Sequence, residues 1–209
     1  GRRNGNANND WARQMFRAYP FNQKHNDNVS GGSENIQYYM AGGFVKDEGL
    51  YRYGNDSYNR YNLLANVDAR ITSWLKMNSS FKYAKSHSDY PLGITTVLRE
   101  HTFGEFITWS PMTPMYNING TIQNPLVRMM QDGGRDRTET NDLLLALGGE
   151  FEPVKGWKTN VSYNHNVITS RGAVNPKPVL VELGDGKFGN IGKPVSSYQA
   201  SFSQPTYSL

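Results

Sequence analysis

Apolar and polar side chains alternate along residues 61–72. One set of alternate positions is apolar or aromatic throughout, and the other is polar except at Leu64 (Tyr61, Leu63, Ala65, Val67, Ala69 and Ile71 against Asn62, Leu64, Asn66, Asp68, Arg70 and Thr72). Successive side chains of a β-strand point to opposite faces, so this period of two predicts a strand with one apolar and one polar face. A helix would instead place Asp68 on its apolar stripe.

The same alternation returns in later segments. After Thr72 and Ser73 it resumes with one apolar and one polar set (Leu75, Met77, Phe81 and Tyr83 against Lys76, Asn78, Ser80 and Lys82). Residues 138–153 and 157–171 alternate around a turn at 154–156, and earlier strands are expected at about 26–30 and 35–48. The sequence thus predicts six antiparallel strands, and SSYQASFS is expected to begin the next one.

The predicted connections fall into two classes. Short turns (GGSE, TS and VKG) alternate with the longer segments 49–58, 86–137 and 172–194. This pattern is typical of outer-membrane β-barrels, which have short periplasmic turns, long outer loops and aromatic residues where the apolar band meets water. Trp74 and Trp157 each follow a short turn and are therefore candidate membrane-interface aromatics. The strands are also much longer than the usual five or six residues of a soluble strand.

A soluble β-sandwich, for instance a carbohydrate-binding module, is the main alternative, because its strands also alternate. The polar face favours the barrel. It carries more charged and amide side chains than a small filled interior could bury without partners, whereas a hydrated lumen or a plug could satisfy them (Asn62, Asn66, Asp68, Arg70, Lys76, Asn78, Lys82, Lys158, Asn160 and Asn164).

Composition narrows the function classes. Mean hydropathy is −0.67 and no apolar run is long enough for a transmembrane helix. Cysteine is absent, so disulfides and thiol catalysis are excluded. The net charge is +4, but the 22 basic and 18 acidic residues are interspersed, so nucleic-acid binding is not indicated. The opening residues GRRNGNANNDW carry no targeting signal, which we expect to lie outside these residues.

Catalytic and metal-binding patterns are also lacking. GDGKFG at 184–189 fits G-x-G-x-x-G, but the residues after it do not predict the helix that a dinucleotide site needs, so a hairpin is expected. The four histidines have no paired ligand spacing. Asp132, Asp136 and Asp142 depart from the EF-hand spacing. We therefore expect no enzyme activity, no metal and no cofactor.

Four segments together resemble the early barrel of SusC/RagA-type TonB-dependent outer-membrane transporters. They are HNDNVSGGSENIQYYMAGGFVKDEGLY, YNRYNLLANVDARITSWLKMNSSFKYAKS, SPMTPMYNINGTIQNPL and FEPVKGWKTNVSYNH. The resemblance covers most of residues 11–170 in order and spacing. It departs at Asp27, Ala41 and Leu64, and residues 172–209 match only loosely.

The resemblance implies a transmembrane β-barrel of 22 strands in the outer membrane of a Gram-negative bacterium. This chain would be an early portion of it, with the plug domain and TonB box outside these residues. It implies TonB-dependent import of nutrients, glycan oligosaccharides or peptides, with a SusD-like surface lipoprotein as partner. In this arrangement residues 1–21 form an extracellular loop, 23–85 hold strands and hairpins, 86–137 form a long extracellular loop, 138–171 form a hairpin, and 172–209 hold an extracellular loop and the start of the next strand.

Aromatic residues on the predicted outer loops are the remaining candidates for binding. Their flat faces could stack on sugar rings or anchor a peptide (Tyr51, Tyr53, Tyr58, Trp109 and Tyr116). The alternative is that they pack the loops against one another or against the lipoprotein. For any single residue, packing is the favoured interpretation, and ligand contact is expected for one or two.

Overall fold

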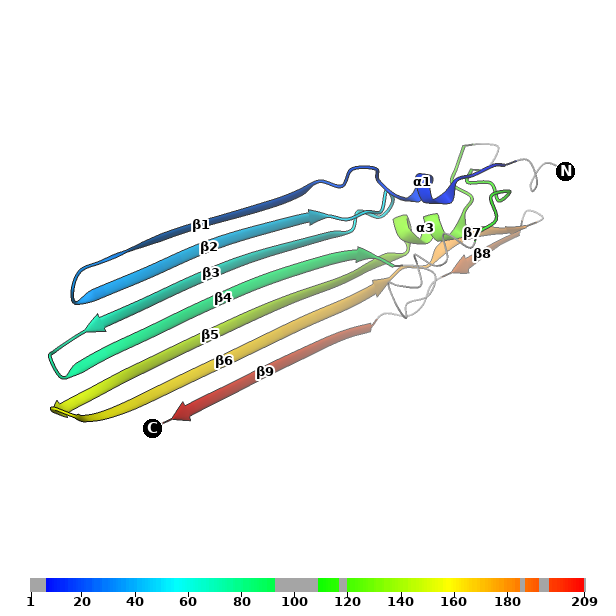
Figure 1. The fold of residues 1–209 in the computed structure, drawn as a ribbon. Helices are drawn as coiled ribbons and strands as arrows, with labels where there is room; N and C mark the ends of the chain where they lie inside the picture. Colours follow the sequence, from blue (N-terminus) through cyan, green and yellow to red (C-terminus); the bar gives the residue numbers. More distant parts are fainter. Residues whose placement is uncertain (1–6, 93–108, 117–119, 185–186, 192–195, 209) are drawn as a thin grey trace.

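Seven long strands form one antiparallel sheet in the computed structural model, which describes residues 7–92, 109–116, 120–184, 187–191 and 196–208 (Figure 1). The sheet order is β1-β2-β3-β4-β5-β6-β9, with bounds β1 Asn22–Gly32, β2 Ile36–Glu48, β3 Ser57–Arg70, β4 Leu75–Pro91, β5 Gly134–Val154, β6 Trp157–Pro176 and β9 Ser196–Ser208. A separate hairpin contains β7 Val179–Gly184 and β8 Lys187–Ile191, and the helices are α1 Trp11–Met15 and α3 Pro125–Asp132.

The six predicted strands are confirmed, and the segment beginning at Ser196 is indeed a strand. Four strands extend by several residues beyond their expected ends, with β1 beginning at Asn22 and β6 continuing to Pro176. β4 continues to Pro91 and β5 already begins at Gly134, and these extensions pair with each other, as in Tyr90 with Asp136. Both extensions are polar on each face, so they have no hydrophobic period although their backbones remain hydrogen-bonded.

The register places the apolar alternate positions on one face of the sheet. Leu63 pairs with Gly42 and Tyr83, and Tyr83 pairs with Leu143. Leu63 is 49% exposed and Val161 on the same face is 38% exposed, because no second sheet covers this face among the residues that the structure describes. The β-sandwich alternative requires such a cover, so the described fold is that of an open barrel wall.

The apolar face has aromatic residues at both of its limits. Phe44 and Tyr61 are in contact near one limit, with ring centroids 4.9 Å apart, while Trp74 and Trp157 lie exposed beside the short turns. The apolar positions from Tyr61 on β3 to Ile71, the first residue after it, span about 33 Å of extended chain, or about 25 Å in height at the usual strand tilt. This height matches the lipid-facing band of a membrane barrel.

Short and long connections lie at opposite ends of the sheet. Residues 33–35, 71–74 and 155–156 join strands at one end, and the helices and the β7–β8 hairpin lie at the other (Figure 1). The helical cap, defined as α1, α3 and the segments 49–56 and 109–116, is held by a buried apolar cluster (Trp11, Met15, Met115, Leu126, Val127 and Met130). No helix in the described residues could span a bilayer.

Both cap helices begin at a side chain that accepts backbone hydrogen bonds. Asn124 Oδ1 accepts from the amides of Leu126 and Val127 over 2.9 and 3.2 Å, and Pro125 occupies the first helical turn of α3. Asp10 caps α1 by accepting from the Arg13 amide over 3.0 Å. The segment WARQMF therefore contains a short, capped helix.

Candidate functional site

Two open grooves lie on the polar face of the sheet, one behind the other along the strands. The groove nearer the cap has a volume of about 520 Å³, and the groove nearer the short turns has a volume of about 560 Å³. Both are lined mainly by the polar alternate positions of the strands. The polar face is thus the hollowed, inner face of the sheet, and the apolar face is the outer one.

The groove nearer the cap combines amide groups with charges of both signs. Its lining includes Asn26, Asn62, Arg60, Lys82 and Asp142. Arg60 Nε donates to Asn62 Oδ1 over 2.8 Å. Asn166 also lines this groove, and its buried Oδ1 has no hydrogen-bond partner among the described residues. The groove therefore offers donors and acceptors to a polar ligand or to a polar protein segment.

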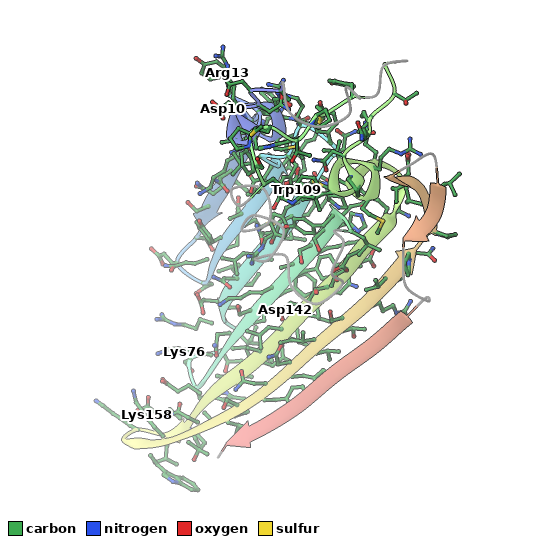
Figure 2. All side chains as sticks on the ribbon, turned by 90° about the vertical axis from the view of Figure 1, so that its right-hand side faces the viewer. Asp10, Arg13, Lys76, Trp109, Asp142 and Lys158 are labelled. Atoms are coloured by element: carbon green, nitrogen blue, oxygen red, sulfur yellow. The ribbon has the colours of Figure 1, made fainter. Side chains whose placement is uncertain are left out.

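The groove nearer the short turns carries a ladder of ion pairs across three strands. Lys76 Nζ lies 3.1 Å from Glu150 Oε1, and Lys158 Nζ lies 3.7 Å from the same oxygen and 3.6 Å from Glu152 Oε2. Figure 2 shows Lys76 and Lys158 near this end, far from Trp109. Because these pairs are partly exposed, we expect them to contribute little to folding stability.

Four of the five predicted loop aromatics are in the helical cap. Trp109 packs edge-on against Trp11 with ring centroids 5.9 Å apart, and Tyr51 lies against Phe16 with centroids 5.7 Å apart. These two contacts fit the packing interpretation. Tyr53 and Tyr116 instead place their hydroxyls 3.5 Å apart at the cap surface.

The environment of the Tyr53 hydroxyl at the cap surface changes its pKa. Partial burial, followed by the hydrogen bond with Tyr116, raises the pKa of Tyr53 to about 12. The Tyr53 hydroxyl is therefore able to donate at neutral pH, while the Tyr116 side chain is exposed. Tyr58 lies apart from the cap cluster, on the polar face of β3 opposite Asp47 and Ser88. Ligand contact by these aromatics remains a prediction.

The loop 49–56 is held by two charged residues that the sequence patterns did not single out. Asp56 is only 7% exposed, and its Oδ1 accepts from the Tyr51 amide over 3.2 Å. Burial raises the pKa of the Asp56 carboxyl. A Cβ on Gly49 would lie 1.6 Å from Asp56 Oδ2, so only glycine permits this close approach.

Arg135 fastens the same loop to the ends of β4 and β5. Its Nε donates to Asp89 Oδ1 over 2.6 Å, Nη2 donates to the Asn55 carbonyl over 2.7 Å, and Nη1 donates to the Gly54 carbonyl. Gly54 and Asn55 both have positive φ, at 86° and 46°. The QDGGRDR sequence contains this arginine, but no local pattern shows that it reaches a loop so far away in the chain.

Two further sequence features concern metal and dinucleotide binding. No group of three metal-ligating side chains occurs there. The GDGKFG segment joins β7 to β8, whose register pairs Gly184 with Lys187, while residues 185–186 lie outside the described residues. The hairpin expected at this position is confirmed.

Comparison with known proteins supports the resemblance seen in the sequence. No family model matches the chain. A TonB-dependent receptor P3 of Formosa agariphila is 24% identical over 197 residues, covering 87% of this chain and 19% of the receptor. The chain therefore spans about a fifth of the curated relative that it matches.

Solved structures of the RagAB peptide importer share the fold. Its closed-closed state matches 97% of this chain and 31% of the importer chain, with a TM-score of 0.64 and 15% identity. Its open-open state matches 98% and 31%, with a TM-score of 0.64 and 16% identity. The predicted fold, a partial wall of a larger antiparallel barrel, is therefore confirmed, and the matched relatives are a receptor and an importer.

Proposed function

We propose, from the premise that this chain is a segment of a SusC/RagA-type TonB-dependent transporter, that it forms part of the wall of an outer-membrane nutrient importer. The apolar face contacts lipid, and the polar face lines the lumen. The cap end faces the cell exterior, where nutrients are captured with a SusD-like surface lipoprotein. The short turns face the periplasm, where TonB acts through the part of the protein that carries the plug.

The observation that carries this proposal is the pairing of an uncovered apolar face with a hollowed polar face on the same long strands. Leu63 and Val161 are exposed on one side, while Asn62, Arg60 and Lys82 line a groove on the other. In water the first face would be an aggregation surface. In a bilayer it contacts acyl chains, and the polar groups remain hydrated inside the barrel.

The polar side chains of the groove and the cap indicate which class of ligand the protein would bind. Amide side chains in the groove and the exposed Tyr53–Tyr116 pair suit a polar ligand with many hydroxyl or amide groups, as in an oligosaccharide or a peptide. The RagAB structures are of a peptide importer, which supports a peptide among these two classes. Aromatic faces and amide groups also suit sugar rings, so both classes are to be tested.

The test compares uptake by cells that carry or lack the full-length gene. Fluorescent oligosaccharides and peptides are offered to both strains and to a strain without functional TonB, and the outer-membrane fraction is probed for the protein. We expect the protein in that fraction, and uptake of one ligand class that needs both the gene and TonB. Recovery of the full-length protein in the soluble fraction, or uptake that does not depend on TonB, would refute the proposal.

A further inference from the structure

A charged patch lies on the outer face of the sheet, immediately beyond the apolar band on the cap side. We call it the outer collar. It contains five cationic and three anionic residues on β2, β4, β5 and β6 (Lys46, Lys85, Arg135, Arg137 and Arg171; Glu48, Asp89 and Glu139). Cations therefore outnumber anions in this patch.

The register places the collar at a defined height. On β4, β5 and β6 the outermost apolar row contains Tyr83, Leu143 and Val167, while on β2 and β3 the band ends one row higher at Phe44 and Tyr61. Lys85 lies two residues further along β4, or roughly 7 Å beyond Tyr83. Arg171 pairs with Glu139 one row higher, and Arg137 lies in the row above that. The cations thus begin where the apolar band ends.

The collar is found at only one edge of the apolar band. At the short-turn edge, the outer positions are apolar or aromatic, as at Leu75, Phe151 and Trp157, in the described strands β4 to β6. The charges near that edge, such as Lys76 and Lys158, lie on the inner face and pair with carboxylates there. If the charges served only to end the apolar band with polar groups, we would expect them at both edges of the band. They occur on the outer face at the cap-side edge and not at the short-turn edge of β4 to β6.

The ion pairs within the collar leave cationic groups available. Lys85 Nζ lies 3.1 Å from Glu139, and Arg135 and Arg137 share Asp89 at 2.6 and 3.1 Å. The Arg137 side chain is nevertheless 58% exposed. Arg171 is also exposed and forms no ion pair with a described residue. Arginine is well suited to phosphate, because its planar fork can donate two parallel hydrogen bonds.

We propose that the outer collar binds the phosphate groups of a lipid headgroup in the outer leaflet, with Arg137 and Arg171 as its principal contacts. This inference rests on the proposed function, because it requires the outer face to meet lipid. The acyl chains lie against the apolar band, and the phosphates lie at the height of the cations just above it. A diphosphorylated glycolipid such as lipid A places two phosphates at the headgroup level and therefore fits a collar of several arginines.

The experiment measures binding of fluorescent diphosphoryl lipid A to the purified full-length protein in mild detergent. The test variant is R137E/R171E, with R137Q/R171Q as a gentler second variant. The control is K24E/K155E, which makes the same change in charge at exposed lysines outside the collar. Lipid A without phosphates and free inorganic phosphate complete the comparison. Thermal unfolding verifies that each protein is folded.

We expect R137E/R171E to weaken lipid A binding by about tenfold or more, and R137Q/R171Q to weaken it less. The control should change by less than about twofold. The lipid without phosphates should bind poorly, and inorganic phosphate should not displace lipid A at an equal phosphate concentration. Unchanged binding by both collar variants, an equal loss in the control, or displacement by inorganic phosphate would overturn the inference.

Failure of this inference can be separated from failure of the proposed function. A protein that is found in the outer membrane and supports TonB-dependent uptake, but shows no preference for phosphorylated lipid, would overturn only the collar. A protein that does not fractionate with the outer membrane would overturn both. The two measurements use the same full-length protein, so the outcomes can be compared directly.

Discussion

Replacing Arg135 with glutamine is expected to loosen the loop 49–56 without unfolding the sheet. The backbone pairing of β5 with β4 and β6 does not depend on the Arg135 side chain, whose guanidinium donates to Asp89 on β4 and to two loop carbonyls, those of Gly54 and Asn55. Glutamine is too short to restore both hydrogen bonds. Asp89 keeps a partner in the variant, because Arg137 Nε lies 3.1 Å from its other oxygen.

The size of the effect follows from the hydrogen bonds that are lost. A hydrogen bond to a charged group contributes about 1.5–3 kcal/mol when it is well shielded. The Arg135 side chain is 24% exposed, so water screens part of that contribution. For the two loop carbonyls together we expect a loss of about 2 kcal/mol in the free energy of loop opening, or about thirtyfold in its opening equilibrium.

Hydrogen exchange on the full-length protein measures this opening. The informative amides are those of Gly49 and Arg52, which donate to Asp56 O and Met15 O, each over 2.8 Å. Their protection should fall about thirtyfold in R135Q and less than about twofold in R137Q, a matched variant that loses an exposed contact to Asp89 but none to the loop. Equal losses in the two variants, or unchanged protection in R135Q, would refute the reasoning.

Three further outcomes are expected. Gly49→Ala should lower the melting temperature of the cap, because its Cβ would overlap the Asp56 carboxylate, whereas Gly42→Ala should not, because no atom lies within 4 Å of its Cβ; circular dichroism of both variants checks this. Burial raises the pKa of Asp56, so the folded cap binds more protons than the unfolded one. Cap stability should therefore be greatest below the ordinary carboxyl pKa of about 4 and should fall as the pH rises through the raised value; denaturation of wild type and Asp56→Asn at several pH values should show this slope only in the wild type. Brominated lipids should quench Trp74 and Trp157 but not the tryptophans of the cap, Trp11 and Trp109; single-tryptophan variants in vesicles measure this, and equal quenching of all four would contradict the assigned orientation.

Alternation along the chain was sufficient to predict the strands that have one apolar face. Val67 and Asn66 are adjacent in sequence and belong to different faces of β3, as the period of two requires. The same rule could not locate the ends of β4 and β5 at Pro91 and Gly134. Those ends carry polar side chains on both faces, so they show no alternation. Their backbones nevertheless remain paired, and backbone pairing cannot be recognised from the types of side chain.

The cap was less predictable, because its contacts join segments far apart in the chain. Asn124 followed by Pro125 was a usable signal for the start of α3, since a side-chain cap and a proline in the first turn favour a helix there. The contacts of Trp11 with Trp109 and of Arg135 with the loop at Asn55 depend on tertiary packing alone. Four of the five aromatic candidates lie in the cap, whereas Tyr58 belongs to β3, and the packing of Tyr51 and Trp109 depends on tertiary contacts that the sequence does not show.

Site-directed labelling of neighbouring residues tests the two-faced wall most directly. Single cysteines at Val67 and Leu145 on the outer face, and at Asn66 and Leu144 on the inner face, are introduced into the full-length protein and labelled with a fluorophore in lipid vesicles. Brominated lipids should quench the labels at 67 and 145 strongly, and a water-soluble quencher should reach the labels at 66 and 144. Leu144 is decisive, because it is apolar but lies on the inner face. The account would be contradicted if brominated lipid quenched the label at 144 as strongly as the label at 145. It would also be contradicted if brominated lipid quenched neither of these two labels.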